Sequence, residues 1–204
     1  MNWINKDTEV YCSFAENAGN TGCQMMNSAF YYYGLNKIYK SFSVNNIEDA
    51  VIAVRTLGIK GFAITMPYKK DVLHFVDNWT DEVELIGAAN NTDFLAARKF
   101  LQYHDYKLFF SKTYVLGNGG YAAAVKAAMK HYNIDPIVIT RENWDSIKDI
   151  KNSLIYNCSP VKNLPIHESN RFIDCIVSST TGHNLARMQA EHQFEMYTGL
   201  KFPY

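Results

Sequence analysis

The chain has 204 residues, enough for one large domain or two small ones, and a 48% hydrophobic share fits a globular protein with a core. Twenty basic and twenty acidic residues cancel without any run of like charge, so we expect neither nucleic acid nor a membrane surface as a partner. No stretch reaches the roughly 18 apolar residues of a transmembrane helix. The charged N-terminus does not resemble a secretory signal, and we expect a cytoplasmic protein.

The first 65 residues alternate between strand-like and helix-like segments. Strands are predicted at 9–13, 39–44 and 60–65, and helices at 23–33 and 47–57. Asn46 can cap the second helix, and Gly58 ends it. The order β-α-β-α-β predicts a parallel or mixed α/β sheet.

The rest of the chain predicts a second block of the same class. Short helices are expected at 69–76 and 80–86, longer ones at 94–103, 121–132 and 184–197, and strands at 112–116, 136–140, 154–156 and 172–177. The interval 141–153 is polar and lacks strong periodicity. We place the boundary between the blocks within the helix 94–103, and we expect the C-terminal helix to complete the first block.

Four cysteines, Cys12, Cys23, Cys158 and Cys175, are spread along the chain. They form no C-x-x-C pair and the histidines are scattered, so we expect no zinc and no other metal site. Reduced thiols are the expectation for a cytoplasmic protein, although Cys12 and Cys23 could pair with each other.

A glycine-rich turn follows the predicted strand 112–116 and precedes a predicted helix. It reads Gly117-Asn118-Gly119-Gly120-Tyr121-Ala122 and satisfies G-x-G-x-x-[GA] in its required context. Gly117 permits the tight turn, Gly119 lets the backbone approach a pyrophosphate, and Ala122 permits close packing of helix on strand. The pattern favours dinucleotide binding, the alternative being a glycine-rich turn that binds nothing.

The residue at the end of the next predicted strand bears on the choice of cofactor. An NAD site has an acidic residue there for the ribose 2′-hydroxyl, whereas this chain has Arg141. A cation suits a 2′-phosphate, which favours NADP, although the neighbouring Glu142 is unfavourable. The alternative is a solvated surface arginine.

Lys69 and Asp93 are the candidates for acid–base chemistry. Lys69 comes directly after the predicted strand 60–65 and Pro67, and ligands of α/β sheets bind beyond the carboxyl ends of strands. An aspartate can orient a lysine ammonium and share its proton load. Lys70 is a rival for the lysine role, and Asp93 could instead cap the helix 94–103.

These residues carry a resemblance to the shikimate dehydrogenase family, and the chain is most similar to its divergent shikimate-dehydrogenase-like branch. The early loop of that branch also carries a Gly-Asn-x-Gly. The matching segments occur in the family's order, and they are the strand-and-lysine segment 61–69, the Gly-Ala-x-Asn segment 87–90, the Asn-Thr-Asp segment 91–93, the glycine turn 117–122, the segment 157–160 and the helix 189–199.

The resemblance implies a fold, an activity and a set of roles. The fold would be α/β: an N-terminal substrate-binding and catalytic domain (1–98, completed by 184–204) and a compact Rossmann-like domain (99–183). The activity would be NADP-dependent reduction of 3-dehydroshikimate to shikimate, a step of aromatic amino acid biosynthesis, in a monomer or homodimer. The implied roles are these: Lys69 and Asp93 as the catalytic pair, Ser13, Thr65, Asn90 and Gln189 on the substrate, and Gly117, Asn118, Gly119, Gly120, Ala122 and Arg141 on the cofactor.

Several departures from the family pattern keep other functions open. Ala15 replaces a second serine of the first loop, Met26 replaces the histidine of a His-Asn pair, and the hairpin that normally separates Asn90 from Asn91 is missing. The stretch after Arg141 is also shortened. The alternatives are a ligand-binding or regulatory module without turnover, and a dehydrogenase for quinate or an amino-substituted ring.

Overall fold

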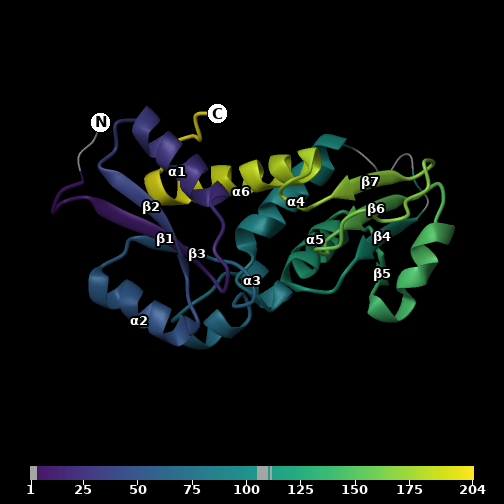
Figure 1. Cartoon of the computed structure of the whole chain (residues 1–204), viewed down its shortest axis with the longest axis horizontal. Helices are drawn as coiled ribbons and strands as arrows, with labels where there is room; N and C mark the ends of the chain where they lie inside the picture. Colours follow the sequence, from purple (N-terminus) through teal and green to yellow (C-terminus); the bar gives the residue numbers. More distant parts are fainter. Residues whose placement is uncertain (1–3, 105–109, 111) are drawn as a thin grey trace. The chain divides into compact units, whose positions relative to one another are not determined.

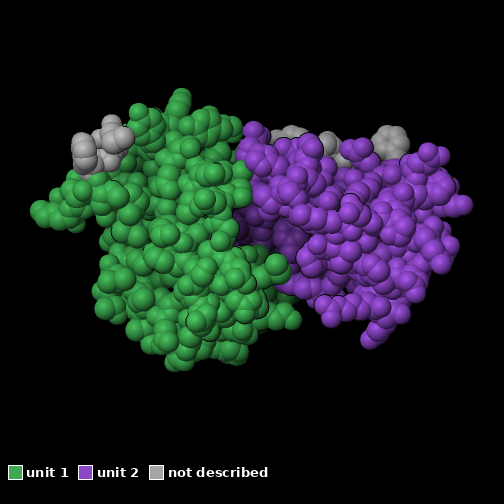
Figure 2. Space-filling view, in the orientation of Figure 1, with its two compact units in different colours: residues 1–90, 190–204 green, residues 91–189 purple. Residues whose placement is uncertain are grey.

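The structure is a computed structural model that describes residues 4–104, 110 and 112–204. It separates into two compact units, Met1–Asn90 with Ala190–Tyr204, and Asn91–Gln189 (Figure 2). The units divide at 90/91 and 189/190, whereas the boundaries expected from sequence are 98/99, inside the helix α4 (Asn91–His104), and 183/184, near the start of the helix α6 (Thr180–Thr198). The whole of α4 joins the second unit because it packs on α5 (Gly120–His131).

The first unit is built on a three-stranded parallel sheet in the order β2-β1-β3 (Figure 1). Its elements are β1 (Glu9–Ala15), α1 (Thr21–Tyr32), β2 (Lys37–Ser43), α2 (Ile47–Leu57), β3 (Gly61–Ile64), a 3-10 helix η1 (Asp71–Phe75) and α3 (Asp81–Ile86). The predicted β-α-β-α-β order is confirmed. Because the strand order reverses at β1, the carboxyl ends of β1 and β3 form the kind of edge at which α/β sheets bind ligands.

Alternate residues of β1 serve opposite faces of this sheet. Tyr11 packs with Phe30 of α1 and Phe194 of α6, whereas Cys12 and Phe14 pack in a second cluster under α2. Figure 1 shows α1 and the end of α6 on one side of the sheet and α2 on the other. Both faces are covered, which explains why the central strand β1 carries apolar residues on both sides.

The second unit contains a four-stranded parallel sheet in the order β5-β4-β6-β7. Its strands are β4 (Thr113–Leu116), β5 (Ile137–Ile139), β6 (Leu154–Asn157) and β7 (Arg171–Asp174). The order reverses at β4, so the turn that follows β4 lies at the topological switch point. The α/β fold class with a Rossmann-like unit is confirmed.

Two predicted segments differ in the structure. The chain from Met66 to Lys70 forms a turn, and only Asp71–Phe75 is helical, as a 3-10 helix. The polar interval after β5 forms a 3-10 helix, η3 (Arg141–Asp149), which begins with a capping box between Thr140 and Asn143. A single fully buried side chain, Ile147, anchors η3 to the core. One buried apolar residue gives no helical periodicity, so the sequence did not predict this helix.

Within the part of the chain that the structure describes, no helix is both long enough and apolar enough to span a membrane.

Candidate functional site

Lys69 and Asn90 are brought together in the first unit. Nζ of Lys69 donates a hydrogen bond to Oδ1 of Asn90 over 2.5 Å. The backbone holds the same two segments together, because the amide of Ala89 donates to the carbonyl of Lys69 over 2.6 Å. Asn90 is 1% exposed, so its side chain is fixed in the protein interior. The pair lies directly beyond the carboxyl end of β3.

The surroundings of Lys69 distinguish it from Lys70, the other candidate for the catalytic lysine. Tyr68 is buried and its hydroxyl donates to the carbonyl of Val44, which anchors the turn. Lys69 is half-buried, whereas Lys70 and Thr65 are exposed. Lys69 is therefore the lysine with a defined polar partner in the interior.

Asp93 and Gln189 form a corresponding pair in the second unit. Nε2 of Gln189, on α6, donates a hydrogen bond to Oδ1 of Asp93. Asp93 lies in the first turn of α4 and is 6% exposed. The helix begins at Asn91, so Asp93 is not its N-cap residue. Its carboxylate in the first turn is favoured by the helix dipole.

Ser13 does not occupy the loop position expected for a carboxylate ligand. It lies within β1, and its hydroxyl donates to the hydroxyl of Ser41 on β2 over 2.9 Å. Ser41 also contacts the thiol of Cys23 from α1. The strand extends to Ala15, two residues further than the predicted 9–13, so Ser13 is an interior residue of the strand and not its last one.

The glycine turn has the backbone geometry that dinucleotide binding needs. Gly117 has φ +99°, and a Cβ there would lie 3.3 Å from the carbonyl oxygen of Cys158. A Cβ on Gly119 would meet nothing within 4 Å, which leaves the backbone at the start of α5 open. Ala122 is fully buried against the sheet. The turn therefore fits a pyrophosphate on a helix N-terminus.

Lys126 adds a cation to this turn that sequence reasoning missed. Its Nζ donates to Oδ1 of Asn118 over 2.7 Å. Its place in the second turn of α5, after the glycines, was the available signal. Arg141 follows β5, the strand beside β4, and is exposed at the start of η3.

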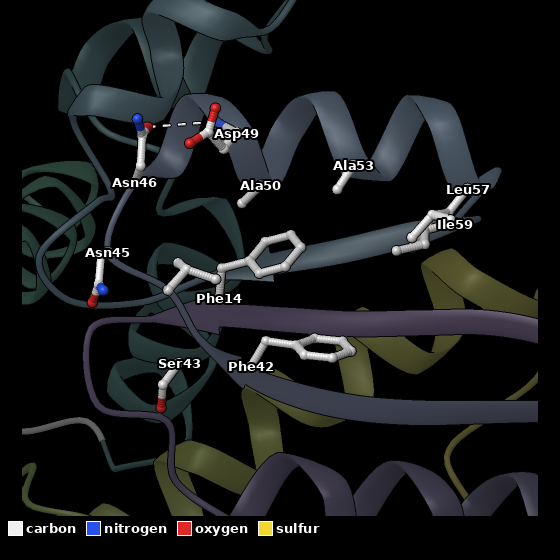
Figure 3. Close-up of a pocket in the computed structure, with 11 residues that line it drawn as sticks. Phe14, Phe42, Ser43, Asn45, Asn46, Asp49, Ala50, Ala53, Leu57 and Ile59 are labelled. Atoms are coloured by element: carbon white, nitrogen blue, oxygen red, sulfur yellow. Dashed lines mark hydrogen bonds between the residues drawn. The ribbon is translucent and has the colours of Figure 1, made fainter.

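A separate pocket of about 410 Å³ lies on the α2 side of the first sheet. Figure 3 shows Phe14 and Phe42 facing Ala50 and Ala53 of α2 across it. None of the sequence-predicted site residues lines this pocket.

All four cysteines are free. Cys12 packs under α2, while Cys23 contacts the cluster on the α1 face, so the two thiols lie on opposite faces of the sheet. Among the residues that the structure describes, no group of three or more histidine, cysteine or acidic side chains could hold a metal ion.

Comparison with known proteins finds relatives of this chain. Residues 21–92 match the shikimate dehydrogenase substrate binding domain. A shikimate dehydrogenase-like protein of Haemophilus influenzae is 35% identical over 153 residues, which cover 69% of this chain and 56% of that protein. A protein named shikimate dehydrogenase (NADP(+)) from Caldanaerobacter subterraneus is 32% identical over 136 residues, 60% of this chain and 49% of the relative. The chain thus spans about half the length of these relatives.

Solved structures extend the likeness over both units. The structure of a shikimate 5-dehydrogenase-like protein matches with a TM-score of 0.80 at 25% identity. The match covers 98% of this chain and 94% of that protein's chain. The shikimate dehydrogenase of Aquifex aeolicus has a TM-score of 0.83 at 20% identity, over 99% of this chain and 97% of its own, which supports the fold alone. Residues 21–92 are thus similar to the substrate binding domain of shikimate dehydrogenases, and the likeness of fold to that family extends over both units.

Proposed function

We propose that the chain is an NADP-dependent oxidoreductase that interconverts a cyclic hydroxy acid and its ketone, with shikimate and 3-dehydroshikimate as the expected pair. The observation that carries this proposal is the hydrogen bond from Lys69 to the buried Asn90 at the carboxyl end of β3. It couples a proton donor to an amide that can bind a hydroxyl group, as the reaction requires.

In this proposal Lys69 handles the proton. During reduction its ammonium gives a proton to the carbonyl oxygen of the ketone, and it recovers a proton from solvent afterwards. Asp93 orients and balances Lys69. Asn90 and Gln189 bind substrate hydroxyls, and Thr65 contacts the same ring. A positioned general acid of this kind contributes about 10²–10⁴-fold to the rate.

The cofactor side of the proposal depends on the glycine turn. The open backbone at Gly119 and the positive φ of Gly117 fit the pyrophosphate of NADP, with Asn118, Gly120 and Ala122 completing the turn. Arg141 would contact the 2′-phosphate. When bound, the reduced cofactor supplies the hydride that the carbonyl carbon receives. Relatives named shikimate dehydrogenase (NADP(+)) and a related structure solved with NADP⁺ support this choice.

The test is NADP⁺ reduction with shikimate, followed for the wild type, Lys69→Ala and Lys70→Ala. We expect activity in the wild type, a loss of at least about 10²-fold in Lys69→Ala, and near-normal turnover in Lys70→Ala, whose side chain is exposed. Equal rates for the wild type and Lys69→Ala would remove Lys69 from the mechanism. A parallel assay with NAD⁺, quinate and an amino-substituted ring would define the cofactor and the substrate.

The position of Ser13 favours a second candidate, a binding or regulatory module that keeps the pocket without turnover. Its hydroxyl donates to Ser41 within the sheet, and this bond competes with the carboxylate contact that the family resemblance implies for Ser13. Calorimetry separates the two functions: binding of shikimate without binding of NADP⁺ and without turnover would support the module.

A further inference from the structure

Cys158 and Cys175 are neighbours at the ends of two adjacent strands. β6 and β7 pair in parallel with Asn157 opposite Asp174, and each cysteine is the next residue of its strand. The pairing continues past the last paired residues, because the amide of Cys175 donates to the carbonyl of Asn157 over 3.1 Å. The two cysteines therefore occupy one level of the sheet.

Their side chains also share one face of the sheet. The side-chain amide nitrogen Nδ2 of Asn157 donates to the carboxylate of Asp174, which places those two side chains together on the other face. Successive residues of a strand point to opposite faces. Neighbouring strands lie about 4.8 Å apart, inside the Cα–Cα window of about 4.4–6.8 Å that a disulfide requires.

The backbone of Cys158 contacts the glycine turn. Its amide donates to the carbonyl of Leu116 at the end of β4 over 2.9 Å. Its carbonyl oxygen lies 3.3 Å from the position that a Cβ of Gly117 would take. A displacement of the Cys158 backbone therefore changes its contact with Gly117 in the glycine turn.

We propose that Cys158 and Cys175 form a reversible disulfide in the presence of a peroxide, and that this disulfide weakens dinucleotide binding at the Gly117–Gly120 turn. The second part rests on the proposed function. Because β6 lies between β4 and β7, closing the disulfide pulls the Cys158 backbone toward β7 and alters its contact with Gly117 at the end of β4.

The oxidation balances with hydrogen peroxide as the oxidant. One thiolate attacks a peroxide oxygen, the O–O bond breaks, and a sulfenic acid and water form. The second sulfur then attacks the sulfenic sulfur, the S–S bond forms, and the S–O bond breaks to release a second water. Burial raises the pKa of the Cys158 thiol, and the adjacent Cys175 side chain adds to the rise, so Cys158 stays protonated at neutral pH and we assign the first attack to Cys175.

Peptide mass spectrometry of the full chain tests the disulfide without any assay of activity. After reduction, desalting and peroxide treatment, we expect tryptic peptides 152–162 and 172–187 to appear as one linked species that a reductant separates. Cys12 and Cys23 are internal controls, because they lie on opposite faces of their sheet. Cys12 and Cys23 should stay alkylatable under conditions that link the other pair. If peptides 152–162 and 172–187 stay separate after the peroxide has been consumed, Cys158 and Cys175 do not form a disulfide.

Fluorescence titration of NADP⁺ tests the consequence. We expect oxidation to weaken NADP⁺ binding by at least about 5-fold in the wild type, to leave Cys175→Ser unchanged, and to be reversed by a reductant. Formation of the link with unchanged NADP⁺ affinity would overturn the effect on the turn. If the reduced wild type does not bind NADP⁺ at all, the proposed function fails, whereas the mass measurement still decides the disulfide.

Discussion

Lys69 reaches Asn90 across 21 residues of chain, and Nζ of the lysine lies 2.5 Å from Oδ1 of the asparagine. The contact joins the turn after β3 to the end of the first unit, just before α4. Because Asn90 is almost fully buried, its side chain does not move with the lysine and holds the ammonium in one place. A proton donor held in this way loses less freedom when a substrate binds.

Removal of the asparagine amide tests this positioning. We expect Asn90→Ala to raise KM for shikimate and to lower kcat, by about 10-fold or more in kcat/KM, because a bound hydroxyl and the ammonium both lose a partner. Steady-state kinetics measures both constants. Asn78→Ala, at an exposed position of the same unit, is the matched control and should change neither. A change in KM alone would assign Asn90 to substrate binding only.

The Gln189–Asp93 hydrogen bond predicts a stability difference along a single helix. Gln189→Met removes a donor to a buried carboxylate, which costs about 1.5–3 kcal/mol in the free energy of unfolding. One turn later, Gln193 donates to the neutral hydroxyl of Tyr197 over 2.9 Å, and Gln193→Met should cost only about 0.5–1.5 kcal/mol. Urea unfolding followed by circular dichroism compares the two variants. Equal losses would mean that the charge of Asp93 adds nothing to its hydrogen bond.

Substitution by alanine should change stability differently at the two glycines Gly117 and Gly119. Gly117→Ala combines a positive φ with a 3.3 Å contact to the Cys158 carbonyl, so we expect a loss of about 1–3 kcal/mol in stability. Gly119→Ala meets nothing within 4 Å and should be neutral to within about 0.5 kcal/mol. If a pyrophosphate approaches this turn, Gly119→Ala should still weaken NADP⁺ binding. Thermal unfolding and a binding titration on each variant measure both effects, and unchanged NADP⁺ affinity in Gly119→Ala would argue against the turn as the cofactor site.

Local signals carried most of the fold. α2 occupies the predicted residues, with Asn46 accepting from the amide of Glu48 and Gly58 at φ +66°. These features depend on neighbouring residues alone, so a single sequence suffices to find them. The strand–turn–helix around Gly117 was accessible for the same reason.

Long-range contacts account for what was missed. The bond from Ser13 to Ser41 depends on which strands pair after folding. The bond from Lys126 to Asn118 joins residues of one turn and the helix that follows it, so it was accessible from sequence and was overlooked. Ser13 was the last residue of the predicted strand 9–13, and the strand in the structure is two residues longer. The pairing of Lys69 with Asn90, and of Asp93 with Gln189, likewise depends on tertiary packing rather than on residue spacing.

Two buried ionisable side chains in the first unit predict a loss of stability at alkaline pH. Burial raises the pKa of Cys12 from 9.0 to about 12 and that of Tyr39 from 10.0 to about 12. Above their ordinary values these groups release protons in the unfolded chain while the folded chain keeps them, so stability is intact below pH 9 and falls between about pH 9 and 12. Each group contributes a slope of up to about 1.4 kcal/mol per pH unit. Urea unfolding between pH 8 and pH 11 should show this decline, and Tyr39→Phe should make it shallower above pH 10. A decline that is equally steep in Tyr39→Phe would assign the effect to other groups, since phenylalanine keeps the ring and removes the ionisable hydroxyl.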